Sequence, residues 1–376
     1  MTAGDANVEL KAHCFDVGRA VGVVQAHGGH LICDHQETDT FFVTATGRLK
    51  YGESADRPSR LIAYHRSGSQ EARRSDYEIA DVRNDGSKII RDTLAGALGT
   101  DIVVDKHRRT FAGDNWLINI DSFLGHDFIE IEVPITGAEA DAQAVMAQLT
   151  SALGVTKLHI LPQSYAQLAH SIPRANSERL LLGSRLHDLV LIDGPSGVGK
   201  STLVHALRQQ LPPDYRFLKR YTCRQERSGD EATDEYNYIP AETFQAMVHH
   251  GDFLESKDFL FGMSYGISWN QVKDALQDQH VDSAYGLMNL GNIRHIKEFT
   301  PEVKCVLITA PIDELRGRLE ARGTHTPDAL AERLDNAKMA SDSQDLYDHV
   351  INNADGLFDA SLAQLTALIQ ATSKSA

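Results

Sequence analysis

Hydrophobic and polar residues alternate in many short segments of the first third of the chain. Examples are NVELKA at 7–12, WLINID at 116–121 and FIEIEV at 128–133, and turn residues such as NDG at 84–86 separate such segments. A period of two is the pattern of half-buried β-strands, and frequent short strands are typical of an antiparallel barrel or sandwich. Helical periodicity falls at about 17–26, 89–98 and 138–153. We therefore predict an antiparallel β-barrel or sandwich accompanied by a few helices.

The pattern changes beyond about residue 155. An apolar segment, DLVLID at 188–193, runs directly into a glycine-rich turn, and helix-period stretches then alternate with apolar segments such as CVLITA at 305–310. This order predicts an α/β domain with a parallel sheet. Pro162, Pro173 and small polar residues mark the junction. We predict a first domain at 1–172, a linker at 173–186 and a second domain at 187–376.

Composition narrows the classes of protein that the chain can belong to. Among 376 residues, 52 are acidic and 37 are Lys or Arg, which gives a formal net charge of -15. This surplus argues against a general nucleic-acid or membrane-surface binder, whose affinity comes from excess cations. The start lacks a secretory pattern, no apolar run approaches the ~20 residues of a membrane span, and the cysteines form no C-x-x-C pair. We expect a soluble cytoplasmic protein that binds neither nucleic acid nor membranes.

The segment GPSGVGKS at 194–201 matches the phosphate-binding pattern G-x-x-x-x-G-K-S/T without exception. Glycines let backbone N–H groups turn inward around phosphates, and the helix that follows directs its positive end at them. Lys200 is expected to reach the β- and γ-phosphates, and the Ser201 hydroxyl is expected to bind Mg²⁺. The predicted ATP-binding residues of this loop are Gly194, Pro195, Ser196, Gly197, Val198, Gly199, Lys200, Ser201 and Thr202.

From His187 to about Ile369 the sequence resembles the guanylate kinase family. The resemblance is carried by YTCRQERSGDEATDEYNY at 221–238, GDFLE at 251–255, SYG at 264–266, LRGRLEARGT at 315–324 and ERL at 332–334. It implies transfer of the γ-phosphoryl group of ATP to the phosphate of a small acceptor, with Mg²⁺ or Mn²⁺ as cofactor. The implied site residues are Lys200, Arg322 and Arg333 for catalysis, Arg318 for ATP, and Arg224, Arg227, Tyr236, Glu255 and Tyr265 for the acceptor.

Departures from this family cluster where the base of the acceptor would be recognised. Arg220 stands at a family serine, Ile267 at a small hydroxyl residue and Met288 at an aspartate. Guanine is a doubtful acceptor, because the loss of these partners leaves polar groups of the base unpaired. Ribose 1,5-bisphosphate phosphokinases, a related branch, share an Arg-Tyr-x-x-Arg segment and a Tyr-Gly-Ile turn. Arg220 is also predicted to bind the acceptor, and it suits a more anionic one. Arg227 and Tyr236 favour the guanylate kinase branch, so both branches stay open.

In the first domain the polar positions of the alternating segments carry charges of both signs. Glu9 and Lys11 share one face of a strand, and Glu130 and Glu132 share one face of another. Strands of this type can close into a barrel with a charged interior, which would hold a polyphosphate and its divalent metal. The alternative is an amphipathic sheet with a solvated charged face.

The same strands resemble the CYTH family, the triphosphate-tunnel fold of class IV adenylyl cyclases and triphosphatases, over about 6–169. Segments such as VELKA at 8–12, GRLK at 47–50, KHR at 106–108 and QSY at 163–165 carry the resemblance. It implies metal ligands at Glu9, Asp121, Glu130 and Glu132, and phosphate contacts at Lys11, Arg48, Lys50, Arg66, Lys106 and Arg108. Asn7 replaces a family glutamate and Gly52 a family arginine, which leaves a binding-only domain as an alternative.

Together these features predict a CYTH-type antiparallel barrel followed by an α/β P-loop kinase domain. The predicted function is ATP-dependent phosphorylation of a small phosphorylated acceptor of the nucleoside monophosphate class. The barrel would bind, hydrolyse or cyclise a triphosphate with a divalent metal. The alternatives are a sugar-phosphate kinase related to ribose 1,5-bisphosphate phosphokinases, and a non-catalytic sensor and interaction protein, against which the complete P-loop argues. A homodimer is a further expectation.

Overall fold

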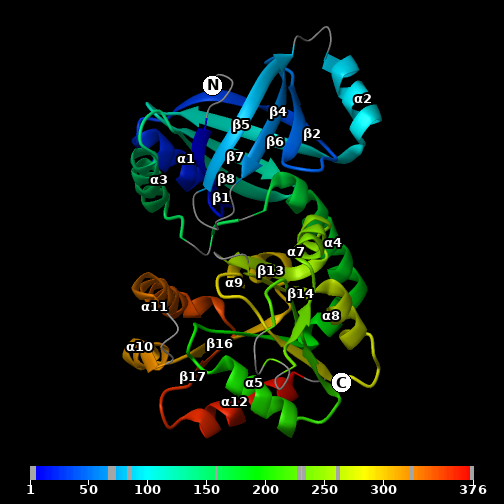
Figure 1. The fold of residues 1–376 in the computed structure, drawn as a ribbon, viewed down its shortest axis with the longest axis vertical. Helices are drawn as coiled ribbons and strands as arrows, with labels where there is room; N and C mark the ends of the chain where they lie inside the picture. Colours follow the sequence, from blue (N-terminus) through cyan, green and yellow to red (C-terminus); the bar gives the residue numbers. More distant parts are fainter. Residues whose placement is uncertain are drawn as a thin grey trace. The chain divides into compact units, whose positions relative to one another are not determined.

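The computed structural model describes residues 6–66, 73–82, 87–156, 159–161, 163–226, 230, 234–259, 263–321 and 326–372. The chain forms two compact units, Met1–His170 and Ser171–Ala376. The first unit contains a β-barrel and the second a sheet with helices around it (Figure 1). None of the helices in the described ranges combines the length and the apolar character that a membrane crossing requires.

The first unit is a closed barrel of eight antiparallel strands in the order β1-β5-β4-β3-β2-β6-β7-β8. Its strands are β1 (Ala6–His13), β2 (His30–Phe42), β3 (Arg48–Ser54), β4 (Ser59–Arg66), β5 (Arg73–Val82), β6 (Thr100–Ala112), β7 (Leu117–Phe123) and β8 (His126–Pro134). Its helices are α1 (Val17–Ala26), α2 (Ser87–Leu98) and α3 (Glu139–Leu153). The predicted antiparallel barrel and its three helices are confirmed.

Successive residues of each barrel strand face opposite sides of the wall. On β1, Val8 belongs to a hydrophobic cluster that also contains Val24 of α1 and Met146 of α3. Glu9 and Lys11, at the other parity, line an interior cavity. Helices α1 and α3 therefore bury apolar residues of the wall, which stabilises the unit by roughly 1.5–3 kcal/mol for each large buried side chain. The charged side is left for the interior.

The second unit contains a five-stranded parallel sheet in the order β10-β15-β9-β16-β17. Its strands are β9 (Leu189–Asp193), β10 (Tyr215–Leu218), β15 (Ser283–Leu287), β16 (Lys304–Thr309) and β17 (His349–Asn352). β9 is central and all of its residues are buried, which explains its continuous apolar run. Helices α5 (Lys200–Gln210) and α12 (Phe358–Ala371) contribute Val204 and Leu365 to the same core. The predicted parallel α/β domain is confirmed.

A four-stranded sheet in the order β12-β11-β14-β13 forms a second part of this unit. Its strands are β11 (Arg220–Thr222), β12 (Tyr236–Tyr238), β13 (Phe253–Phe259) and β14 (Met263–Ser268). The register places Arg220 opposite Tyr236 and Thr222 opposite Tyr265. The remaining helices are α7 (Ala241–His249), α8 (Trp269–Leu276), α9 (Ile293–Phe299), α10 (Ile312–Ala321), α11 (Pro327–Asp342) and the short η2 (Gln344–Leu346).

The segment for which a linker is predicted, 173–186, is helical. It lies in the second half of α4 (Tyr165–Leu182) and in the 3-10 helix η1 (Gly183–Asp188). Pro173 lies inside α4, where proline normally disfavours a helix because it lacks an N–H donor. Leu168 and Ile172 on the same helix are almost completely buried, and this packing holds the helix through the proline.

Candidate active site

The loop after β9 has the backbone that a phosphate-binding loop requires. Gly194, Gly197 and Gly199 have φ values of 150°, 86° and 98°, which side chains rarely permit. A Cβ atom on Gly194 would lie 2.5 Å from the carbonyl oxygen of Ile308, and one on Gly199 would lie 2.7 Å from Asn353 Nδ2. The turn therefore depends on glycine at both ends, and α5 begins at Lys200 directly after it.

Lys200 and Ser201 lie at the start of α5 with their polar atoms at this loop. Lys200 Nζ donates to the carbonyl oxygens of Gly194 and Pro195. Ser201 Oγ donates to Glu235 Oε2 at 3.3 Å. Glu235 is only 3% exposed, and its Oε1 has no hydrogen-bond partner among the described residues. A hydroxyl beside a buried, incompletely satisfied carboxylate fits a hard divalent cation such as Mg²⁺.

Of the three arginines predicted for catalysis and ATP binding, one contacts this loop directly and a second is linked to it through Asn353. Arg333 of α11 donates to Ser196 Oγ at 3.0 Å. Arg318 of α10 donates to Asp355 and to the carbonyl oxygen of Asn353, and Asn353 Nδ2 in turn donates to the carbonyl oxygen of Val198. The third, Arg322, lies outside the described residues.

A buried pair at the end of β9 was not predicted from the sequence. Tyr347 Oη donates to Asp193 Oδ2 at 2.5 Å, and the Gly194 N–H donates to Asp193 Oδ1 at 2.6 Å. Burial raises the pKa of Asp193, although both hydrogen bonds favour its ionised form. Asp193 therefore fixes the first peptide of the loop. Its position between an apolar strand and a glycine is the only signal that the sequence offers.

Arginine and tyrosine side chains gather on β11, β12 and β14, where the acceptor site is predicted. Arg220 donates to Tyr236 Oη at 2.8 Å, and its guanidinium group lies 5.1 Å from the ring centres of Tyr236 and Tyr265. Arg224 lies 4.5 Å from the Tyr236 ring centre and donates to Asp230 at 2.6 Å. The structure thus brings together four predicted acceptor residues, and Arg227 lies outside the described part of the chain.

Glu255, the fifth described residue of the predicted acceptor site, is held by amide donors of the protein itself. Asn289 donates to it through its backbone N–H and its side chain, and Asn292 donates through Nδ2 at 2.7 Å. Burial raises the pKa of Glu255 to about 7, although these bonds favour the ionised carboxylate. Ile267 and Met288 are 0% and 1% exposed, so neither offers a polar group or a free surface to a base.

The barrel encloses a cavity of about 460 Å³. Six predicted residues line it, namely Glu9, Lys11, Lys50, Arg108, Glu130 and Glu132. Arg48, Lys106 and Asp121 do not: Arg48 donates to Ser164 Oγ, Lys106 to Asp39, and Asp121 accepts from Arg108 and Tyr165. The side chain of Arg66 lies outside the described residues.

Charge in this interior is distributed unevenly. Arg108 forms a two-bond contact with Asp121 and lies 2.9 Å from Glu130. Glu132 instead accepts only neutral amide donors in the hydrogen bonds observed, from Asn119 at 2.8 Å and Asn7 at 3.2 Å. Burial and the neighbouring Glu130 and Glu9 raise the pKa of Glu132 to about 7. Carboxylates that repel one another in this way fit a divalent cation with oxygen ligands.

Several residues inside the barrel escaped prediction. Glu37 and Asp39 are buried inward-facing residues of β2, and Arg57 pairs with Glu37 at 2.9 Å. The i, i+2 spacing of polar residues from Cys33 to Asp39 was the available signal, since it places them on one face of a strand. It was weak because β2 also carries polar residues on its other face.

A central parallel strand that leads into a complete phosphate-binding loop, with an arginine of a later helix at that loop, is the arrangement of a P-loop kinase. The guanylate kinase family model matches residues 186–372. The guanylate kinase of Vibrio parahaemolyticus is 31% identical over 188 residues, 49% of this chain and 87% of that protein. The guanylate kinase of Frankia casuarinae is 34% identical over 182 residues, 48% of this chain and 96% of that protein. The chain belongs to the guanylate kinase family.

The barrel lies outside this match. A solved structure similar to it is the PH1012 protein of Pyrococcus horikoshii OT3, with a TM-score of 0.38 and 16% identity over 42% of this chain and 96% of that chain. In its own topology, the closed ring of eight antiparallel strands resembles the CYTH fold expected from the sequence.

Glu255 predicts a specific pH dependence of stability. With a pKa raised from 4.5 to about 7, it holds a proton in the folded chain that the unfolded chain has released across this window. Its contribution to stability is therefore present at low pH and is lost as the pH rises towards 7. We expect Glu255→Gln to gain about 2–3 kcal/mol in unfolding free energy relative to the parent between pH 5 and 8. Urea denaturation measures this, with the exposed Glu242→Gln as control. A difference that does not change with pH would contradict the assignment.

Proposed function

We propose that the second unit transfers the γ-phosphoryl group of ATP to the phosphate of a small phosphorylated acceptor, and that the product is a diphosphate. The observation that carries this proposal is a set of buried arginine donors at both ends of the candidate site. Three buried Nε atoms have no hydrogen-bond partner among the described residues. They belong to Arg333 at the loop, to Arg220 on β11 and to Arg224 just after β11. An anionic ligand at each end would satisfy donors whose burial otherwise costs about 1–3 kcal/mol each.

The proposed roles follow from where the side chains lie. Lys200 and Arg333 would stabilise negative charge on the transferred group from two sides of the loop, and Arg322 would join them. Arg318 would hold the segment around Asn353 against the loop near the donor nucleotide. Mg²⁺, or Mn²⁺, held through Ser201 and Glu235, would neutralise charge on the phosphates when bound.

The acceptor proposed here carries a phosphate and lacks a guanine base. Arg220, Arg224 and Tyr236 form a cationic and aromatic pocket that suits a phosphate with further anionic or hydroxyl groups. Glu255, which would pair with guanine in the family, is engaged by Asn289 and Asn292. A nucleoside monophosphate with another base and a sugar bisphosphate both satisfy this description.

One prediction from this proposal concerns catalysis. We expect Lys200→Ala to reduce phosphoryl transfer at least about 10³-fold, because the charge next to the transferred group is lost. Thermal unfolding should be almost unchanged, since the hydrogen bonds observed for Lys200 Nζ go to carbonyl oxygens of the loop. A coupled enzyme assay of ADP release measures the rate. Lys338→Ala, at an exposed position of α11, is the matched control. Turnover of Lys200→Ala at the parental rate would contradict the assignment of the active site.

A second prediction concerns the acceptor. We expect GMP to be a poor acceptor. Two or three unpaired polar groups on the buried base cost ~1–3 kcal/mol each, and together they reduce kcat/KM by several orders of magnitude. Steady-state assays would compare GMP, dGMP, AMP, UMP and ribose 1,5-bisphosphate. Arg220→Ser, which restores the family residue, should shift preference towards GMP. A kcat/KM of ~10⁵ M⁻¹s⁻¹ or more for GMP would make the chain an ordinary guanylate kinase.

We propose for the barrel that its cavity binds a triphosphate with a divalent cation. Lys11, Lys50 and Arg108 line the cavity as cations, and Glu9, Glu130 and Glu132 line it as carboxylates, of which Glu132 has a pKa raised to about 7 by burial and by the other two. Cations and a metal together would balance a highly charged polyphosphate. Hydrolysis, cyclisation and binding without turnover are the outcomes that an assay separates.

The barrel proposal is tested on the full chain in a Lys200→Ala background, which silences the kinase site. Tripolyphosphate, thiamine triphosphate and ATP would be supplied with Mg²⁺ or Mn²⁺, with phosphate release and calorimetric binding as readouts. We expect Glu130→Gln and Glu132→Gln to weaken metal-dependent binding at least about tenfold, because the cation loses a ligand. The exposed Glu78→Gln on β5 should behave like the parent. Absence of both binding and turnover for all three compounds would refute the proposal.

A further inference from the structure

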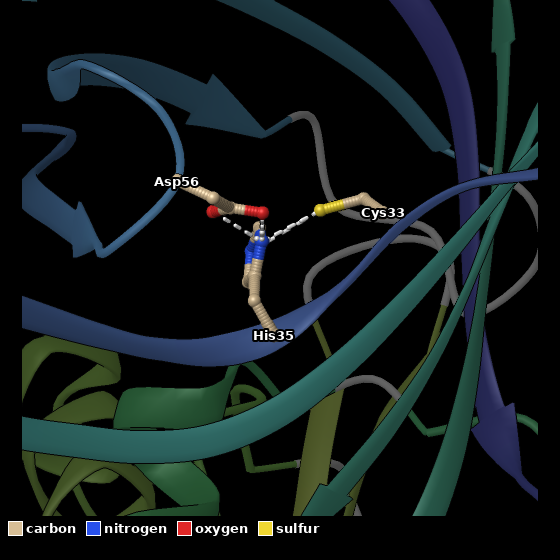
Figure 2. A group of neighbouring side chains, drawn as sticks. All are labelled: Cys33, His35 and Asp56. Carbon is tan, nitrogen blue, oxygen red and sulfur yellow. Dashed lines mark hydrogen bonds and ion pairs between the residues drawn. The ribbon is translucent and has the colours of Figure 1, made fainter.

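Three side chains of different chemistry meet at the wall of the barrel. Cys33 and His35 are two residues apart on β2, and Asp56 lies in the turn between β3 and β4. His35 Nδ1 lies 2.7 Å from Cys33 Sγ and 2.8 Å from an Asp56 carboxylate oxygen. Figure 2 shows the three side chains pointing at one another from these separate segments. His35 is 8% exposed, so its ring is fixed by its surroundings.

The geometry of this cluster favours a metal site over a nucleophile relay. In a Cys-His-Asp relay, one ring nitrogen contacts the sulfur and the other contacts the carboxylate, so that a proton can pass across the ring. Here His35 Nδ1 makes the shortest approach to both Cys33 and Asp56, and the other ring nitrogen, Nε2, lies farther from Cys33 Sγ, at 3.4 Å. Donor atoms that converge on one point are the arrangement of a metal site.

The donor set selects the kind of metal. A sulfur, an imidazole nitrogen and a carboxylate oxygen together favour Zn²⁺ or a similar borderline cation, whereas Mg²⁺ takes oxygen ligands. This separates the cluster from the all-carboxylate group of Glu9, Glu130 and Glu132. With a Zn–S distance of about 2.3 Å and a Zn–N distance of about 2.0 Å, sulfur and nitrogen lie roughly 3.5 Å apart in a tetrahedral site. The side chains would therefore part by less than about 1 Å to admit the ion.

Neighbouring groups support the cluster and link it to the cavity. Ser54 Oγ donates to Asp56 Oδ1 at 3.2 Å, which orients the carboxylate as outer-shell partners do in metal sites. Cys33 also lines the 460 Å³ cavity, together with Arg57 and Glu37. A site with three protein ligands keeps a fourth position for water or another ligand, and the cavity borders this one at Cys33.

We propose that Cys33, His35 and Asp56 bind one Zn²⁺-class cation in the barrel wall, with a fourth position for water or an oxygen of a phosphate held in the cavity. The proposal goes beyond the kinase reaction and is independent of it. No residue of the cluster belongs to the kinase unit, so Lys200→Ala should leave the metal site unchanged.

Cobalt substitution tests the site on the full, metal-free chain. Titration with Co²⁺ should give one equivalent with the thiolate-to-cobalt charge-transfer absorption of a tetrahedral thiolate site, and Zn²⁺ should displace it. Cys33→Ser should abolish this absorption, and His35→Gln and Asp56→Asn should weaken Co²⁺ affinity at least about tenfold. Cys14→Ser, at another half-buried cysteine of the same unit, is the matched control and should retain both.

Asp56→Asn separates loss of metal binding from loss of folding. The side chain of Asp56 is 52% exposed, so its replacement leaves the core intact. Zn²⁺ should also raise the thermal unfolding temperature of the parent and of Cys14→Ser, and this shift should vanish in Cys33→Ser. Absence of a thiolate signal with Co²⁺ would overturn the proposal. Its persistence in Cys33→Ser, or unchanged affinity in both His35→Gln and Asp56→Asn, would do so as well.

Discussion

Asp39 is completely buried inside the barrel, with Lys50 at 2.9 Å and Lys106 at 2.5 Å. Burial alone would neutralise this carboxyl group, yet the two ammonium groups hold its pKa well below the usual range. A charge that leaves water has to be matched by a partner, and this constraint shapes both units. Where protein partners suffice, as at Asp39, the contact is structural. Where they fall short, as at Glu132, burial raises the pKa of the carboxyl group, and this is an observation behind the ligand site proposed for the cavity.

In the kinase unit the groups that need a partner of opposite charge are cations. Its candidate site is rich in buried guanidinium groups, and the Nε donors of Arg220, Arg224 and Arg333 are incompletely satisfied by the described residues. The one carboxylate expected to meet a base, Glu255, is already saturated by amide donors of Asn289 and Asn292. These contacts support the proposal of an acceptor that carries a phosphate and lacks a guanine base.

The sequence predicted most of the fold because the dominant patterns are local. Alternation along β1 and β8 and the glycine spacing at 194–199 each identify an element without reference to distant residues. Contacts between distant segments were beyond its reach. Tyr347 and Asp193 are separated by 154 positions, and no local pattern announces their pairing. The contact of Lys106, a predicted phosphate ligand, with Asp39 at a separation of 67 positions is a second such pairing.

The most direct test of the central claim, that a P-loop kinase unit acts on a phosphorylated acceptor, is to follow where the γ-phosphoryl group of ATP goes. The full chain carrying Glu130→Gln, which is expected to weaken the metal-dependent binding proposed for the barrel, would be incubated with Mg²⁺ and ATP labelled in the γ-phosphoryl group, together with a panel of sugar and nucleoside phosphates. Mass spectrometry would then locate the label. The account predicts a labelled diphosphate on at least one acceptor, with one ADP formed per product. Label found only in inorganic phosphate, or ATP left intact with every acceptor, would contradict it.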